Sequence, residues 1–266
     1  MILCSSVIIL HSIGFYLLRN VKRGKFNVNN ILLTCFSGNE ILYGVNNVLY
    51  HVLAIQGNLS RLIVFHIEIF AVVPLLNSTL FLITLNRYIA CIHPRVYRKY
   101  ATKKSLATII VSTWLFSLVA GVVVWLVWNS DTTTMYWWMT ISVNTIFIFM
   151  LFAYIRIYLR LANSSQRVSI HLPGQQNLKL HSILWNYVFH QGHITSVCIV
   201  VCYFLFIIIP VLVTFVLFLY DTCYSCLLWF GMMANLNCIL DAIIYIYTDR
   251  DVRKLWVKKV HRMMSL

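Results

Sequence analysis

Charged residues are scarce in this chain of 266 residues, and acidic residues are the scarcest of them. Charged residues make up 11% of the sequence and apolar residues 61%, with only 7 aspartates and glutamates in total. A soluble globular domain carries about 25% charged and about 45–50% apolar residues, so this composition cannot cover a surface that faces water. The composition therefore excludes a soluble enzyme domain and predicts an integral membrane protein.

Glycine, proline and catalytic motifs are also scarce. The 9 glycines and 4 prolines leave no room for a long flexible linker. The sequence has no HExxH metal motif, no GxSxG nucleophile motif and no glycine-rich phosphate loop. We therefore expect a protein that is not an enzyme and that carries no organic cofactor.

The 8 cysteines follow no clear metal-binding pattern. Most of them lie inside apolar runs, where cysteine behaves as a small apolar residue. The exception is Cys223-x-x-Cys226, which falls in a predicted outer loop. In that setting a small disulfide or two free thiols is expected rather than a bound zinc ion, so no metal is predicted.

Long apolar runs are what the sequence does contain. A helix needs about 20 apolar residues to cross the hydrocarbon core of a bilayer. Residues 1–248 therefore predict an all-α membrane protein, a bundle of seven transmembrane helices with short outer loops and a long inner loop at about 160–192. The predicted spans are residues 2–18, 28–53, 62–88, 105–128, 136–160, 194–219 and 224–247.

The first span begins almost at Met1, so either the N-terminus lies at the membrane surface or the natural chain starts earlier. A cleaved signal peptide is the alternative for this run. It is disfavoured because the run is followed by the basic segment 19–25 and not by a small-residue cleavage site.

Basic residues gather on one side of the predicted membrane. After the first, third, fifth and seventh spans come 20 of the 21 lysines and arginines, and only Arg61 falls on the other side. Because cytosolic loops are enriched in lysine and arginine, the N-terminus is predicted to be extracellular and the C-terminus cytosolic. The position of the lysines and arginines in the predicted cytosolic segments accounts for the excess of positive charge, so no nucleic-acid partner is predicted.

The C-terminal segment 249–266 is predicted to form an amphipathic cytosolic helix and tail. Its apolar residues recur at steps of three and four, including Trp256, and alternate with lysines and arginines. Such a helix lies on the anionic inner leaflet, so membrane lipids are expected partners. The alternative is a solvated basic tail.

Three carboxylates fall inside the predicted spans. Glu40 and Asp241 lie at membrane depth, while Glu68 lies near the outer surface, where it could reach water. Ionisable groups in the membrane are costly and are usually functional. If Glu40 and Asp241 are neighbours, a shared proton or a bound cation would relieve their repulsion. The alternative for each is a hydrogen-bonded contact between helices.

The end of the third span carries Asn86-Arg87-Tyr88, followed by Pro94 and Tyr97. This segment resembles the Asp-Arg-Tyr box and the following loop of rhodopsin-like (class A) G-protein-coupled receptors, with asparagine at the acidic position. Further matches fall in the right spans and order, at Phe36–Gly44 with Glu40 at the acid, Trp114, Tyr154–Ile157, Phe204 with Pro210, and Asp241–Tyr245. The departures are Ile208 for a tryptophan, Ala242 for a proline, and a missing outer disulfide.

The resemblance implies a receptor that transduces an extracellular ligand into activation of a heterotrimeric G protein at the plasma membrane. It assigns coupling and switching to residues at the cytosolic end, namely Asn86, Arg87, Tyr88, Pro94, Tyr154 and Tyr245. It also assigns a switch in the sixth span to Phe204 and Pro210. The family's sodium site is matched by Glu40, Asn237 and Asp241, although Leu76 replaces a small polar residue there.

Ligand-binding positions carried over from the family are mostly apolar or aromatic. They are Tyr50, His51, Ile69, Phe70, Val73, Trp138, Ser142, Val211, Phe215 and Asn235. Ile69 stands where amine receptors carry an aspartate, so a neutral or lipid-like small molecule, or the hydrophobic end of a peptide, is favoured over an amine. Asn58-Leu59-Ser60 predicts a glycosylation site on an outer loop.

Two other functions are consistent with the same sequence. A seven-span transporter is one, although no internal repeat is present and the mid-span prolines are not symmetrically placed. A receptor homologue that does not couple to G proteins and acts as a membrane partner is the other.

Overall fold

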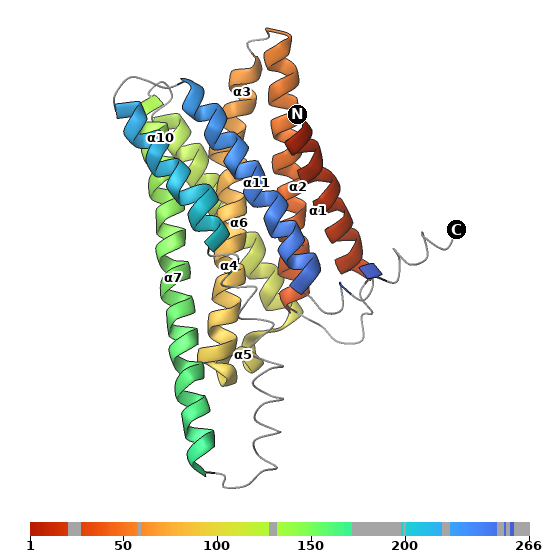
Figure 1. The fold of residues 1–266 in the computed structure, drawn as a ribbon, viewed down its shortest axis with the longest axis vertical. Coiled ribbons are helices and arrows are strands. Elements are labelled where there is room, and N and C mark those ends of the chain that lie inside the picture. The colour runs from red at the N-terminus through yellow and green to blue at the C-terminus, as the bar shows by residue number, and fades with distance from the viewer. Residues whose placement is uncertain are drawn as a thin grey trace, which may run out of the picture.

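The fold is known from a computed structural model (Figure 1), which describes residues 1–20, 28–57, 60–127, 132–171, 198, 201–219, 224–248, 253 and 256–257. Some side chains within these ranges are not described. Throughout the described part of the chain the backbone is helical, apart from short turns, and contains no strand. The expectation of an all-α protein is therefore confirmed.

The helices follow the predicted spans closely. They are α1 (Ile2–Asn20), α2 (Val28–Ile55), α3 (Ser60–Ile67), η1 (Glu68–Val72), α4 (Val73–Ile92), α5 (Pro94–Tyr100), α6 (Lys103–Val127), α7 (Thr132–His171), η3 (Phe204–Ile208), α10 (Ile209–Leu219) and α11 (Tyr224–Thr248). Here η marks a turn of π-helix. The segments α3, η1 and α4 follow one another without a break and form one long rod.

Several helices are suited to a membrane. Within the described residues, Ile2–Asn20, Ile63–Ile92, Lys103–Leu126 and Thr140–Arg160 are long and apolar enough to cross a bilayer, and 201–213 and 232–244 are shorter apolar helices. The outward face of α6 exposes large apolar side chains, such as Phe116 at 75% and Leu126 at 64%. Lipid can cover such a face, whereas water cannot without a large cost. The finer count of seven spans stays a prediction.

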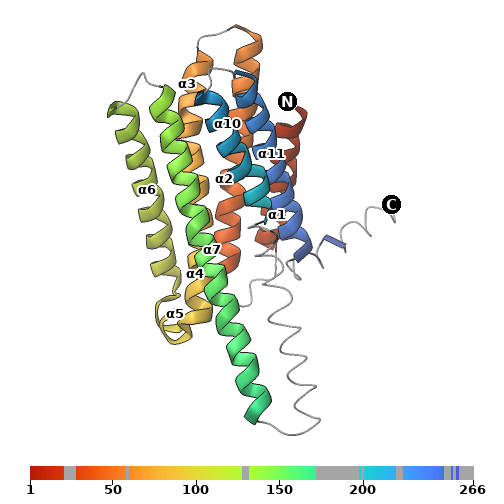
Figure 2. The ribbon, with the colours of Figure 1, turned by 60° about the vertical axis from the view of Figure 1, so that its left-hand side comes forward.

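One boundary was predicted wrongly. The long inner loop was expected to begin near residue 160, but α7 continues to His171 and extends past the other helices (Figures 1 and 2). The cause is local, because no proline or glycine occurs between Arg160 and Pro173, so nothing interrupts the helix earlier.

Of the predicted amphipathic segment 249–266, the structure describes Arg253, Trp256 and Val257, all of them helical. Trp256 is half-buried and packs against the hydrophobic core, while Val257 is exposed. These three residues agree with a helix, and the rest of the segment lies outside the described residues.

The rod formed by α3, η1 and α4 is the centre of the packing. Helix α4 contacts α2, α6 and α7, whereas α1 contacts α2 and α11. Hydrogen bonds between side chains join these layers. The amide of Asn39 donates to the hydroxyl of Thr79 at 2.9 Å, and the indole N–H of Trp114 donates to the same hydroxyl at 3.0 Å. Such bonds fix the relative rotation of helices in lipid.

Two α-helical segments of the bundle are each interrupted by one turn of π-helix. Each π turn ends two residues before a proline. In η1 the N–H of Val73 donates to the carbonyl of Glu68, and in η3 the N–H of Ile209 donates to the carbonyl of Phe204. The next residues are Pro74 and Pro210. Proline has no N–H for the carbonyl four residues earlier, and its ring clashes with that carbonyl, so the preceding turn widens.

Candidate functional site

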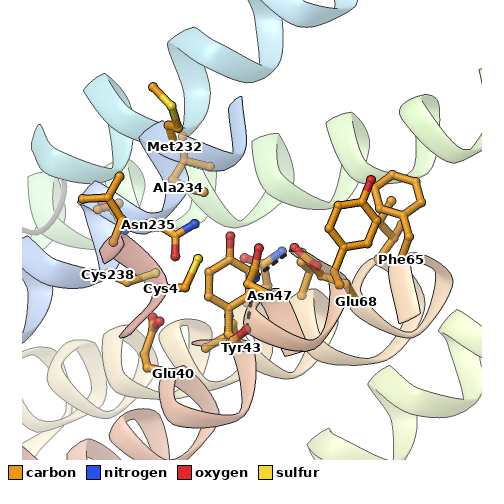
Figure 3. Close-up of a pocket in the computed structure, with 18 of the residues that line it drawn as sticks. Cys4, Glu40, Tyr43, Asn47, Phe65, Glu68, Met232, Ala234, Asn235 and Cys238 are labelled. Atoms are coloured by element: carbon orange, nitrogen blue, oxygen red, sulfur yellow. Dashed lines mark hydrogen bonds between the residues drawn. The ribbon is translucent and has the colours of Figure 1, made fainter. Parts of the chain in front are cut away.

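A cavity of about 640 Å³ lies in the half of the bundle that holds Met1 and the end of α2. Its wall is mostly apolar and comes from α1, α2, α3, η1, α4, α7, η3 and α11. A cavity of about 300–1,000 Å³ with a few polar groups is typical of a small-molecule site. Figure 3 shows Glu68, Asn47 and Phe65 toward one end and Glu40, Cys238 and Asn235 toward the other.

Five of the ten predicted ligand-binding residues line this cavity, namely Tyr50, His51, Ile69, Val73 and Asn235. The other described ones do not line it, namely Phe70, Trp138, Ser142 and Val211. The side chain of Phe215 lies outside the described residues. For Phe70 the reason is visible, since η1 brings its backbone against Gly121 of α6 and therefore away from the cavity.

The end of the cavity near Phe65 holds the carboxylate of Glu68 (Figure 3). It accepts hydrogen bonds from the side-chain amide of Asn46 at 3.2 Å and from that of Asn47 at 3.3 Å. The same amides also donate to the carbonyls of Val64 and Tyr43. Glu68 therefore does not reach out to water as a lone surface group, and helix α2 holds it in place.

Of the predicted polar core, Glu40 and Asn237 line the cavity and Asp241 does not. Glu40 and Asp241 are almost fully buried and close enough for their charges to interact. The thiol of Cys238 hydrogen-bonds the carboxyl group of Glu40, and the amide of Asn237 donates to Asp241 at 3.0 Å. One oxygen of each of Glu40, Asn237 and Asp241 has no hydrogen-bond partner. These three buried oxygens suit either a shared proton or a hard cation such as sodium.

A polar contact on the wall of the cavity was not predicted from the sequence. The phenol of Tyr203, which precedes η3, donates to the side-chain oxygen of Asn77 on α4 at 3.1 Å. Both residues are buried and both line the cavity. An asparagine and a tyrosine 126 residues apart give no signal in the sequence that they meet.

Near the C-terminal end of α4, Asn86 hydrogen-bonds the phenol of Tyr97 on α5. Burial raises the pKa of Tyr97 above its ordinary value, and the bond with Asn86 lowers it in part. The ring of Tyr88 lies 6.4 Å from that of His93 and 6.3 Å from that of Phe152. Asn86 is therefore tied to the short helix that follows.

The remaining predicted residues are less closely grouped. Pro94 begins α5, and Tyr154 is buried on α7. Phe204 is 41% exposed and stacks on Phe147 of α7 with ring centres 5.5 Å apart, while Pro210 is buried. The side chains of Tyr245 and Cys226, and the residues Asn58 and Cys223, lie outside the described residues. Among the described residues, no three histidine, cysteine, aspartate or glutamate side chains form a metal-binding group.

Comparison with known proteins identifies no relative. No protein-family model matches the chain, and no curated protein matches it. A function for this chain therefore has to be inferred from its own residues and their arrangement.

Proposed function

We propose that the protein is a seven-span receptor of the rhodopsin-like kind, which couples an extracellular ligand to a heterotrimeric G protein at the plasma membrane. In this proposal the N-terminus is extracellular and the basic loops are cytosolic. The ligand occupies the cavity, and the G protein engages the end of α4 around Arg87. Membrane lipids surround the bundle.

The observation that carries the proposal is the cavity itself. It is about 640 Å³ in volume and is enclosed by helices from both halves of the chain. Five residues that the resemblance assigns to ligand binding line it. Glu40, which also lines it, and Asp241 are both buried.

A physical route links the cavity to the cytosolic end. The rod of η1 and α4 carries Glu68 and Asn77 at the cavity and Asn86 and Arg87 at the opposite end. The bond from Asn77 to Tyr203 ties this rod to η3, the turn that precedes Pro210. A ligand that favours one arrangement of η3 shifts the population of states by its difference in affinity for them.

The experiment is guanine-nucleotide exchange by a panel of purified G proteins with the full chain in lipid nanodiscs. We expect exchange with at least one G protein, and its loss in Arg87→Gln. Because the restraining acid is replaced by Asn86, we also expect exchange without added ligand, and Asn86→Asp lowers it. Ser117→Ala, whose hydroxyl bonds only within α6, is the control for reconstitution.

Other outcomes identify the alternatives. Folded protein that activates no G protein in the panel contradicts the proposal and favours a non-coupling membrane partner. Uptake of radiolabelled solutes into vesicles that contain the chain, with no nucleotide exchange, favours a transporter.

A further inference from the structure

Three buried polar atoms on the cavity wall have no hydrogen-bond partner among the residues that the structure describes. They are the nitrogen Nδ2 of Asn77, the oxygen Oε2 of Glu40 and the oxygen Oδ1 of Asn237. All three residues line the cavity, and their exposed fractions are only 8%, 3% and 4%. Buried polar groups are nearly always hydrogen-bonded, so this part of the cavity is suited to a molecule that completes their bonds.

Asp241 brings the residues that carry these atoms together. It accepts a hydrogen bond from the amide of Asn237 at 3.0 Å. It also lies close enough to Glu40 and Tyr203 for its charge to act on both. Tyr203 in turn donates to the side-chain oxygen of Asn77 at 3.1 Å, which leaves the nitrogen of the same amide for another partner. The three atoms therefore belong to one polar end of the cavity.

This polar end combines hydrogen-bond donors with acceptors, which limits the chemistry of a ligand. The amide nitrogen of Asn77 carries two N–H donors, whereas the oxygens of Asn237 and of an ionised Glu40 are acceptors. An ammonium group has no acceptor for Asn77, and a carboxylate has no donor for the two oxygens. A primary carboxamide has one acceptor oxygen and two N–H donors, so it matches the whole set. A hydroxyl group has one donor and matches less of it.

Apolar side chains continue the wall from this polar end. On α4, Val73 lies about one helical turn before Asn77, and Ile69 lies in η1 before Val73. Both apolar residues line the cavity, which measures about 640 Å³. An ordered water molecule needs two to four polar partners, so water is held at the polar end but not along the apolar wall. An apolar body joined to a carboxamide suits both parts of the cavity.

We infer that this cavity binds a neutral amphipathic molecule, a primary carboxamide with an apolar body. The carbonyl oxygen of the ligand accepts from Asn77, and its two N–H groups donate to Glu40 and Asn237. The apolar body lies along Val73 and Ile69. The inference names the ligand class of the proposed receptor and in that respect rests on the proposed function, although binding itself needs no G protein.

The test compares four probes with one carbon skeleton, namely 2-phenylacetamide, 2-phenylethanol, phenylacetate and 2-phenylethylammonium. Binding to the full chain in nanodiscs of neutral phosphatidylcholine is followed by ligand-observed NMR and by the midpoint of thermal unfolding, with empty nanodiscs as the blank. We expect the amide to bind at least about threefold more tightly than the alcohol, and at least about tenfold more tightly than either charged probe. This comparison needs only the unmodified chain.

Variants assign the preference to the polar end and the binding to the cavity. Asn77→Asp replaces the N–H donors by an oxygen and keeps an acceptor for Tyr203, so the amide should lose its advantage over the alcohol. Asn144→Asp, on α7 and outside the cavity lining, is the same substitution and should keep that advantage. Val73→Phe fills part of the cavity and should weaken the binding of all four probes by at least about threefold.

The inference is overturned if the alcohol or the ammonium probe binds as tightly as the amide in the unmodified chain. It is also overturned if Asn77→Asp keeps the preference for the amide, or if Val73→Phe leaves binding unchanged. Its failure is distinguishable from that of the proposed function. A preference for the amide without activation of any G protein keeps the carboxamide site and removes the receptor. Nucleotide exchange with equal affinity for all four probes keeps the receptor and removes the carboxamide site.

Discussion

The two π turns, η1 and η3, have the same local cause and different surroundings. Each ends two residues before a proline, and each closes with a bond from a backbone N–H to the carbonyl five residues earlier. No residue of η1 is exposed, whereas Phe204 and Leu205 of η3 are 41% and 47% exposed. The turns thus share their chemistry but not their packing.

Helix α6 accounts for part of this difference. A Cβ atom added to Gly121 would lie 1.8 Å from the carbonyl oxygen of Phe70, which is a contact that only glycine allows. Pro74 has no N–H to donate to this same carbonyl. The backbone of η1 therefore packs directly on the backbone of α6. No described glycine approaches η3 as closely.

The same local structure, a π turn before a proline, therefore serves two purposes in this protein. In η1 the packing against α6 fixes the extra residue of the π turn. This residue sets the direction of the Glu68 side chain. In η3 the exposed turn is held across the bundle by the bond from Tyr203 to Asn77. A π turn that is fixed by backbone packing is suited to a binding site. A π turn that is held by one side-chain hydrogen bond is suited to a segment that changes conformation.

The largest effect is expected from Gly121→Val, which disrupts the contact between η1 and α6. The added side chain overlaps the backbone of Phe70, and backbone cannot move aside as a flexible side chain can. We expect a loss of about 3 kcal/mol or more in the free energy of unfolding, seen as a large drop in the thermal midpoint.

Gly38→Ala is the matched control, since no atom lies within 4 Å of the Cβ position at Gly38. Alanine favours a helix over glycine by roughly 0.5–1 kcal/mol, so this variant should be unchanged or slightly more stable. Equal losses in the two variants would mean that η1 is not held by its contact with α6.

A smaller effect is expected from Tyr203→Phe, which removes the hydrogen bond that Tyr203, next to η3, donates to Asn77. The phenol hydroxyl is lost, and the buried side-chain oxygen of Asn77 loses the hydrogen bond that Tyr203 donates. We expect a loss of about 1–3 kcal/mol in thermal or denaturant unfolding. Basal nucleotide exchange should rise as well, because η3 becomes freer to move. A stability loss with unchanged exchange would make the bond structural only.

The smallest effect is expected from replacing the prolines, Pro74→Ala and Pro210→Ala. Both variants restore an N–H that can donate to the carbonyl four residues earlier. In η3 we expect the turn to gain α-helical bonds and its amide hydrogen exchange to slow by a few-fold. In η1 the contact with Gly121 should keep the π turn, so exchange there should change little. Slower exchange in both turns would show that proline alone maintains them.

Much of the fold was predictable from the sequence. Apolar runs gave helices at each predicted position where the chain is described, because a backbone in lipid has to satisfy its own hydrogen bonds. The error at the end of α7 arose from reading polar residues as a loop. A polar segment without proline or glycine continues a helix when nothing stops it.

The candidate site was only half predictable. Tyr50, Val73 and Asn235, which the resemblance assigned to ligand binding, line the cavity. Counting residues back from Arg87 along an unbroken α-helix gave the wrong orientation for Glu68 and Phe70. The π turn of η1 adds one residue and so changes the rotation of the helix. Asn77 and Tyr203 were missed because their contact joins distant parts of the chain.

The sequence alone therefore determined the class of the protein and the position of its helices, through apolar length and the distribution of positive charge. Only the tertiary structure decided which side of each helix faces the cavity. That choice depends on turns widened by proline and on how closely neighbouring backbones approach. The place of Glu68 on the cavity wall is a consequence of packing between helices, which a pattern along one helix does not contain.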